Sequence, residues 1–243
     1  MGTRCLIFGL RRETLYNVHM ANRAYVSAWA KDYSEATQLE RLQNLLATVP
    51  FSASWPGFTG LVVRALEPAE APIREWDLRA QMIGSAEIIE LMREPQGPDI
   101  AYEIRALWDL WIYDLDSGRW QSKPQELQID CYGTEYDGGI AEREGDFLID
   151  IGFEHLFTGH AGMLGANPGP KAPAAHLEEA RFLASMASPE RLREYHQRTR
   201  ENIQILLHWL RDAETSVPLE RYKLWSEGEE NFESRVDEIL AVR

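Results

Sequence analysis

The chain has 243 residues, and its 39 acidic against 25 basic side chains give a formal charge of −14. Hydrophobic residues make up 44% of it, which predicts a folded rather than a disordered ground state. The charge argues against nucleic acid and against an anionic membrane surface as partners, and no apolar run reaches the roughly 20 residues of a membrane-spanning helix.

The N-terminal segment, MGTRCLIFGLRR, has an apolar run too short for a signal peptide and no small-residue cleavage pattern. We therefore expect a cytoplasmic protein. Residues 4–10 predict a short buried strand. Cys5 and Cys131 both lie in apolar, strand-like segments, so we expect buried, reduced thiols rather than a disulfide framework.

The first 100 residues mix helical and strand-like patterns. Residues 14–31 and 37–47 predict helices, the second with a capping box formed by Thr37 and Glu40. Its leucines recur at helical spacing. A loop rich in proline and glycine follows at 50–60. Further along the chain we expect two strands and a short helix, at residues 60–66, 73–80 and 86–93.

Three segments then alternate between apolar and polar residues with period two, at about 101–114, 126–132 and 147–154. Such alternation is typical of half-buried strands in an antiparallel sheet. The sequence Asp116-Ser117-Gly118 predicts a hairpin turn after the first of them. The glycine-containing stretch from 133 to 145 is acidic, which indicates a surface loop.

The last part of the chain predicts helices. A glycine- and proline-rich linker at 159–173 precedes a helix from Ser188 to about 212, and a final helix spans about 229–241. We expect an α+β fold whose antiparallel sheet is packed by N-terminal helices and by a helical C-terminal extension. In this interpretation residues 1–158 form the core and 174–243 the extension, within one structural domain.

The negative charge is concentrated in one part of the chain. Residues 101–160 hold 13 acidic and 4 basic side chains, a net of −9. The strand alternation places many of the acids on the face opposite the apolar set. Acids with aromatic neighbours suit the docking of a basic partner. The candidate partner-binding residues are Glu103, Asp109, Trp111, Tyr113, Asp130, Tyr132 and Asp150.

Two other kinds of site use the same region. Asp109, Asp130 and Asp150 are candidate ligands of a divalent metal, because hard cations take oxygen ligands. Glu154, His155 and His160 are candidate catalytic residues at a strand end. The two histidines are five residues apart with the glutamate before both, which is not the spacing of a zinc-protease helix. No nucleotide fingerprint or nucleophile motif occurs, and we expect no cofactor.

We therefore favour a non-catalytic binding module, of the inhibitor or immunity type, that uses an acidic sheet face toward a basic protein. One alternative is a metal-dependent hydrolase or related enzyme with a carboxylate and histidine site. Another is the structural subunit of a homo-oligomer that associates through its C-terminal helices.

Overall fold

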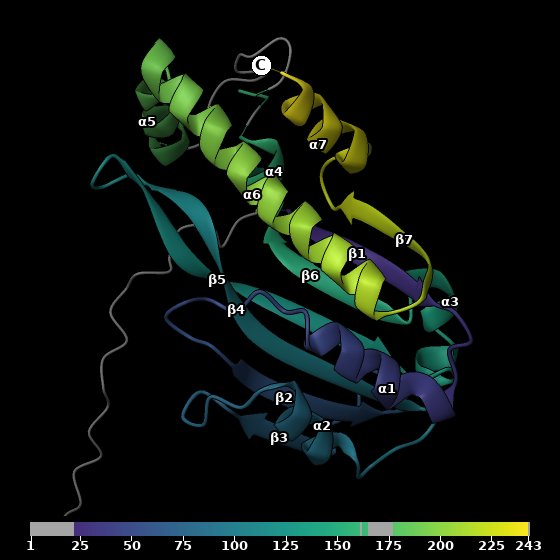
Figure 1. Ribbon diagram of the computed structural model, residues 1–243. Coiled ribbons are helices and arrows are strands. Elements are labelled where there is room, and N and C mark those ends of the chain that lie inside the picture. Colours follow the sequence, from purple (N-terminus) through teal and green to yellow (C-terminus); the bar gives the residue numbers. More distant parts are fainter. Residues whose placement is uncertain (1–21, 161, 165–176, 243) are drawn as a thin grey trace, which may run out of the picture.

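An antiparallel sheet of seven strands lies at the centre of the computed structural model (Figure 1). The structure describes residues 22–160, 162–164 and 177–242. The strand order across the sheet is β3-β2-β4-β5-β6-β1-β7, and every neighbouring pair is antiparallel. The strands are β1 (Arg23–Ala30), β2 (Phe58–Ala65), β3 (Arg74–Asp77), β4 (Ile100–Asp114), β5 (Arg119–Tyr132), β6 (Phe147–Phe153) and β7 (Leu219–Ser226).

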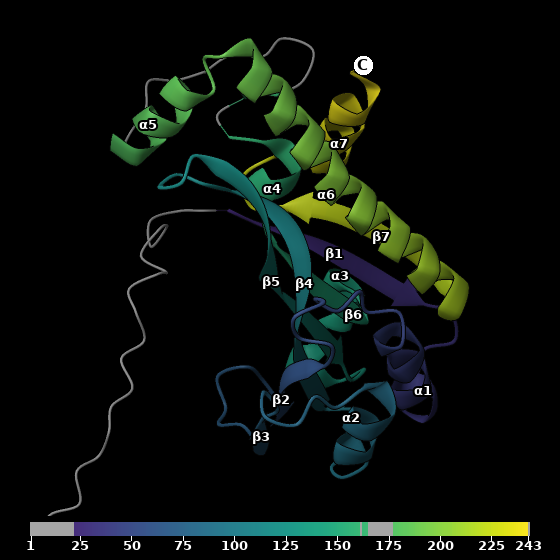
Figure 2. The same ribbon diagram turned by 60° about the vertical axis from the view of Figure 1, so that its left-hand side comes forward.

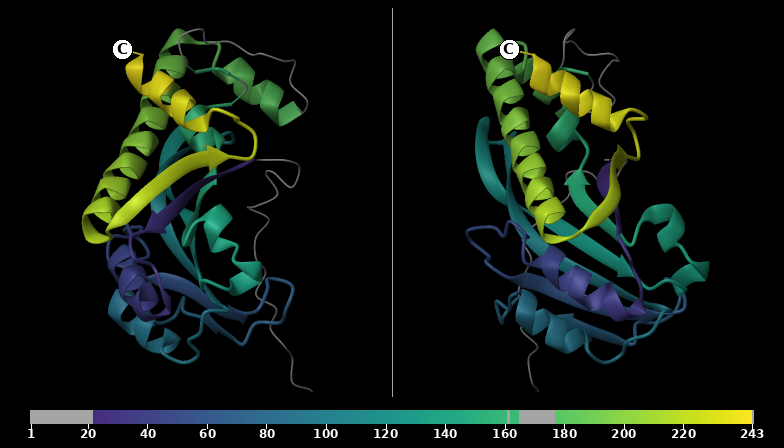
Figure 3. Two further views of the ribbon diagram at one scale, coloured as in Figure 1. Left: turned by 90° about the vertical axis from the view of Figure 1, so that its right-hand side faces the viewer. Right: turned by 45° about the vertical axis from the view of Figure 1, so that its right-hand side comes forward.

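The helices are unequally divided between the two faces of the sheet. Figure 3 shows α1, α2 and α6 on one face and the short α3 on the other. The expected α+β class, with an antiparallel sheet and C-terminal helices, is confirmed. The helices are α1 (Glu35–Leu46), α2 (Ser85–Met92), α3 (Ala141–Glu144), α4 (His155–Thr158), α5 (Leu177–Ser185), α6 (Pro189–Ser216) and α7 (Phe232–Ala241), with a 3-10 turn, η1 (Tyr136–Gly138).

The three segments with period-two alternation form β4, β5 and β6, as predicted. Their apolar sides face the helices, and side chains such as Ile104, Ile129 and Ile149 are buried. Strands β4 and β5 form one long hairpin that closes at the predicted turn, where Gly118 has a φ of 63°. A positive φ costs glycine nothing because it has no Cβ. Local alternation therefore predicted both the strands and their buried sides.

The prediction of a helix over 14–31 is wrong for its second half. Residues 23–30 form β1, which pairs with β6 on one side and β7 on the other. The buried side of β1 is made mainly of alanines, which favour helices when considered alone. Pairing on both sides overrides that preference. Residues 14–21 and the strand expected at 4–10 lie outside the described part of the chain.

The segment after α6 also differs from the expectation. No strand was expected there, yet residues 219–226 form β7 at one edge of the sheet. Its charged side chains weaken the apolar alternation, as is common in edge strands. The other expected elements form within a few residues of their predicted bounds. Helix α1 begins earlier than predicted, and its capping contact runs from the Ser34 N–H to the Thr37 hydroxyl, at 3.0 Å.

The main core lies between the sheet and the helices. Trp108 of β4 is fully buried and contacts Phe157 of α4 and Trp209 of α6, with ring centroids 6.1 and 5.9 Å away. The buried side chains of α6, among them Ile203, Leu206 and Leu210, lie on this core. Cys131 is a buried free thiol, as expected, whereas Cys5 lies outside the described residues. Most of the predicted linker at 159–173 also lies outside them.

The tip of the β4–β5 hairpin is held by the helices that follow in sequence (Figure 2). Tyr113 lies 5.3 Å from Trp120 and 5.7 Å from Phe182 of α5, measured between ring centroids. Trp120 in turn stacks on Tyr195 of α6 at 5.4 Å. An aromatic cluster therefore joins α5 and the start of α6 to the end of the sheet.

Candidate functional site

Three of the predicted acidic residues lie together on the face of the sheet turned away from α1, α2 and α6. Glu103 lies directly opposite Asp130 on the neighbouring strand, and Asp150 lies opposite Gln128. Directly opposed residues have Cβ atoms about 5 Å apart and diagonal ones about 7 Å, so Glu103 and Asp150 are both neighbours of Asp130. We call this surface the open sheet face and define it by Arg23, Tyr25, Glu103, Arg105, Glu126, Gln128, Asp130 and Asp150.

Arginines compensate two of these carboxylates. Arg64 of β2 forms an ion pair with Glu103 at 2.5 Å, and Arg23 of β1 forms one with Asp150. All four side chains are less than one third exposed. The open sheet face is therefore a mixed surface, and less acidic than the sequence alone predicts.

Asp130 is the exception on this face. Its Oδ1 accepts a hydrogen bond from the Gln128 amide at 2.9 Å, and it has no ion pair within the described residues. Burial, with repulsion from Glu103 and Asp150, raises the pKa of Asp130 to about 7. A carboxyl group near its pKa at neutral pH would gain from a nearby positive charge, because an opposite charge favours the ionised form.

An aromatic pair lies beside these carboxylates. Tyr25, which is opposite Asp150 in the register, stacks on Trp225 of β7 with ring centroids 4.5 Å apart. The Trp225 indole donates to the Ser27 hydroxyl at 3.0 Å, and the Tyr25 hydroxyl donates to Glu227 at 2.9 Å. The sequence interpretation missed this pair, because it assigned Tyr25 to a helix and no strand to Trp225.

Three of the predicted partner-binding residues are engaged within the chain instead. Asp109 accepts hydrogen bonds from the Ser52 hydroxyl at 2.7 Å and the Ala53 N–H at 2.9 Å, which fixes the loop after α1. Tyr132 is 9% exposed and stacks on Tyr136 of the turn that follows β5. Tyr113, as described above, belongs to the hairpin-tip cluster.

The three aspartates proposed as metal ligands do not converge. Asp109 lies six residues along β4 from Glu103, the residue opposite Asp130, which is about 20 Å in an extended strand. In the part of the chain that the structure describes, no group of three or more His, Cys, Asp or Glu side chains is arranged to hold a metal ion.

The predicted catalytic candidates form a packed pair rather than an open acid–base site. The rings of His155 and His160 stack at 4.1 Å, between Phe153 on one side and Phe182 on the other. Burial lowers the pKa of His160 to about 4 and that of His155 well below its usual value. Glu154 accepts a hydrogen bond from the Gly228 N–H at 3.1 Å. Two neutral, stacked imidazoles suit a role in joining α4 to α5.

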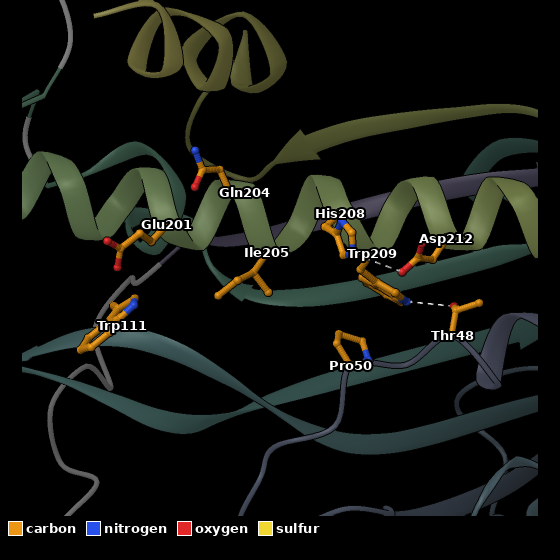
Figure 4. A pocket seen from close by; sticks show the side chains of 9 residues that line it. All are labelled: Thr48, Pro50, Trp111, Glu201, Gln204, Ile205, His208, Trp209 and Asp212. Carbon is orange, nitrogen blue, oxygen red and sulfur yellow. Dashed lines mark hydrogen bonds and ion pairs between the residues drawn. The ribbon is translucent and has the colours of Figure 1, made fainter. Parts of the chain in front are cut away.

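A second surface feature is a groove of about 510 Å³ between α6 and the segment after α1 (Figure 4). Trp111 lies at one end of it. The guanidinium of Arg198 lies over the Trp111 ring, 3.8 Å from its centroid, and forms an ion pair with Glu201 at 2.8 Å. The groove is lined by Thr48, Pro50, Trp111, Glu201, Gln204, Ile205, His208, Trp209 and Asp212.

Asn202 positions this part of α6 against β4. Its side-chain carbonyl accepts from the Trp111 N–H at 2.8 Å, and its NH₂ group donates to the Trp111 carbonyl at 3.0 Å and to the Leu156 carbonyl at 3.1 Å. Strand β2 pairs with β4 only as far as Ala106, so the edge beyond that residue is free of a strand partner. The side-chain amide of Asn202 takes the place of a neighbouring strand for the N–H and C=O of Trp111.

No helix within the described ranges is long and apolar enough to cross a membrane. A comparison of the chain with protein-family models, curated proteins and solved structures finds no match in any of the three.

Proposed function

We propose that this protein is a non-catalytic binding module that uses the open sheet face toward a basic protein partner. The observation that carries the proposal is the placement of Asp130. It lies between Glu103 and Asp150 on neighbouring strands, and its hydrogen-bond partner is a neutral amide. Arg105 on the same face lowers the pKa of Asp130 without forming an ion pair with it, and a lysine or arginine from a partner would supply that ion pair.

The surroundings of Asp130 suit an interface. Glu126, four residues before Asp130 on the same side of β5, is exposed, and the stacked Tyr25–Trp225 pair lies on the other side of Asp150. Rigid aromatic side chains beside desolvated charges are typical of binding hot spots. An inhibitor or immunity-type protein that blocks a basic enzyme would use such a surface.

A pull-down from an extract of the native host tests the proposal. We expect the wild-type chain to retain a basic protein at about 50 mM salt, because charge pairs are weakly screened there. Glu126→Lys should abolish that retention, since it places a positive charge on the open sheet face. Asp130→Asn should weaken it.

The matched control is Glu233→Lys, which makes the same charge change at an exposed position on α7. It should leave retention unchanged. Retention of the same partner by Glu126→Lys at low salt would contradict the proposal, provided that this variant melts at the wild-type temperature.

A further inference from the structure

The groove along α6 is a second surface, on the helical side of the sheet. Its lining combines apolar side chains with carboxylates. The side of the groove formed by α6 is apolar at Ile205 and Trp209, and Trp111 closes one end. Pro50 lies on the facing wall (Figure 4). The Trp209 indole donates to the Thr48 hydroxyl at 3.0 Å, so a hydrogen bond joins the two walls. The walls are therefore held in place without a ligand.

Carboxylates stand at both ends of this groove. Glu201 and Asp212 are eleven residues apart on α6, which corresponds to about 16 Å along a helix. No lysine or arginine lines the groove. The Asp212 carboxylate lies 3.8 Å from the His208 ring and is more than half exposed. The charged groups of the lining are thus acidic, with apolar surface between them.

The Trp111 end already shows how a cation is held there. Arg198 stacks on the indole ring and pairs with Glu201, so the chain places its own guanidinium between an aromatic face and a carboxylate. Such stacking is typical of arginine, whose planar guanidinium is weakly hydrated. At the other end the one basic group of the lining near Asp212 is the exposed His208 ring, 3.8 Å away, and no lysine or arginine of the lining pairs with this carboxylate.

We propose that this groove binds an extended basic segment of a partner protein. In an extended segment, alternate residues point to the same side, and the first and fifth of five residues lie about 13 Å apart, so long basic side chains can cover the rest of the span. A central apolar side chain would therefore lie over Ile205, while a basic side chain two residues from it reaches Asp212. On the other side a second basic side chain would lie near Glu201, whose carboxylate also accepts hydrogen bonds from Arg198 and Gln197. The site is separate from the open sheet face and does not depend on its function.

Fluorescence anisotropy with a labelled Arg-Ser-Leu-Ser-Arg peptide and the full chain tests this proposal. We expect saturable binding by the wild-type protein and an affinity at least tenfold lower for Asp212→Lys. Glu214→Lys is the matched control, because it makes the same charge change on the same helix outside the groove. It should alter the affinity less than twofold.

The remaining comparisons separate a specific site from general charge attraction. A Glu-Ser-Leu-Ser-Glu peptide should not bind the wild-type protein, and it should bind Asp212→Lys more tightly than it binds Glu214→Lys. Glu126→Lys, on the open sheet face, should bind the basic peptide as the wild type does. Equal losses for Asp212→Lys and Glu214→Lys, or no saturable binding by the wild type, would overturn the proposal.

Discussion

At the scale of single residues, Asp130 combines a candidate binding role with a cost to stability. Its pKa of about 7 lies above the usual 3.8, so between these pH values the folded protein holds a proton that the unfolded chain has released. Folding is therefore increasingly disfavoured as pH rises from about 4 to 7, and the full cost is present above pH 7.

We expect Asp130→Asn to stabilise the protein. The gain in the free energy of unfolding should be about 1 to 3 kcal/mol at pH 8, because the amide has no charge to bury. At pH 5 the gain should be less than half as large. Urea unfolding at both pH values measures it, with Glu233→Gln as the control. An equal gain in stability at both pH values would show that the pKa of Asp130 is not raised in the folded protein.

Asn202 has the opposite character, because it satisfies backbone groups that are buried or partly buried. Asn202→Leu would leave the N–H and C=O of Trp111 without their partner at the edge of β4. Each orphaned buried group costs about 1 to 3 kcal/mol, so we expect a loss of at least 2 kcal/mol in the free energy of unfolding.

Chemical denaturation measures the loss in Asn202→Leu. The matched control is Gln204→Leu, which removes the same kind of amide from an exposed position of the same helix. Its effect should stay within about 0.5 kcal/mol. A similar loss in both variants would show that the amide of Asn202 has no special role.

At the scale of elements, the stacked histidines link α4 to α5 through Phe182. Both rings are neutral when buried. The pKa of His160 is about 4 in the folded protein against 6.5 in an unfolded chain. The unfolded state thus binds more protons between these values, and stability is lost as pH falls from 6.5 toward 4.

We expect the free energy of unfolding to fall by about 1 to 2 kcal/mol per titrating histidine between pH 6.5 and pH 5. His160→Phe should reduce this dependence, since a phenyl ring can occupy the same aromatic cluster without titrating. Thermal melts across this pH range measure the effect. The exposed His208 supplies the control, and His208→Gln should leave the pH dependence unchanged. An unaltered slope in His160→Phe would exclude the histidine pair as its cause.

At the scale of the whole molecule, the net charge is −14, and −9 of it lies in residues 101–160. A field of one sign accelerates the encounter with an oppositely charged partner. We therefore expect the association rate of the basic partner to fall about tenfold as salt rises from about 50 to 300 mM, with a smaller change in the dissociation rate.

Surface plasmon resonance at several salt concentrations measures both rates. Asp130→Asn should mainly speed dissociation, because it acts by a short-range contact. If the association rate does not depend on salt, the acidic region does not steer the partner.

Much of the sheet was accessible to prediction because strand alternation is a local property. In β4, β5 and β6 the buried and polar residues alternate along each strand, and the structure confirms their faces. Strand β1 was not predicted, because its buried alanines carry little hydrophobic contrast. For the candidate site, the sequence predicted only which acidic residues share a face of the sheet, and not which of them are neighbours.

By itself, the sequence determined the α+β class, the central strands, the side of each that is buried and the region where acidic charge gathers. Tertiary structure alone decided which charges are compensated and which side chains meet. Arg23 pairs with Asp150 across 127 positions, and Trp225 reaches Ser27 across 198. The physical reason is that composition and periodicity report local preferences, whereas these contacts depend on the strand order that brings distant segments together.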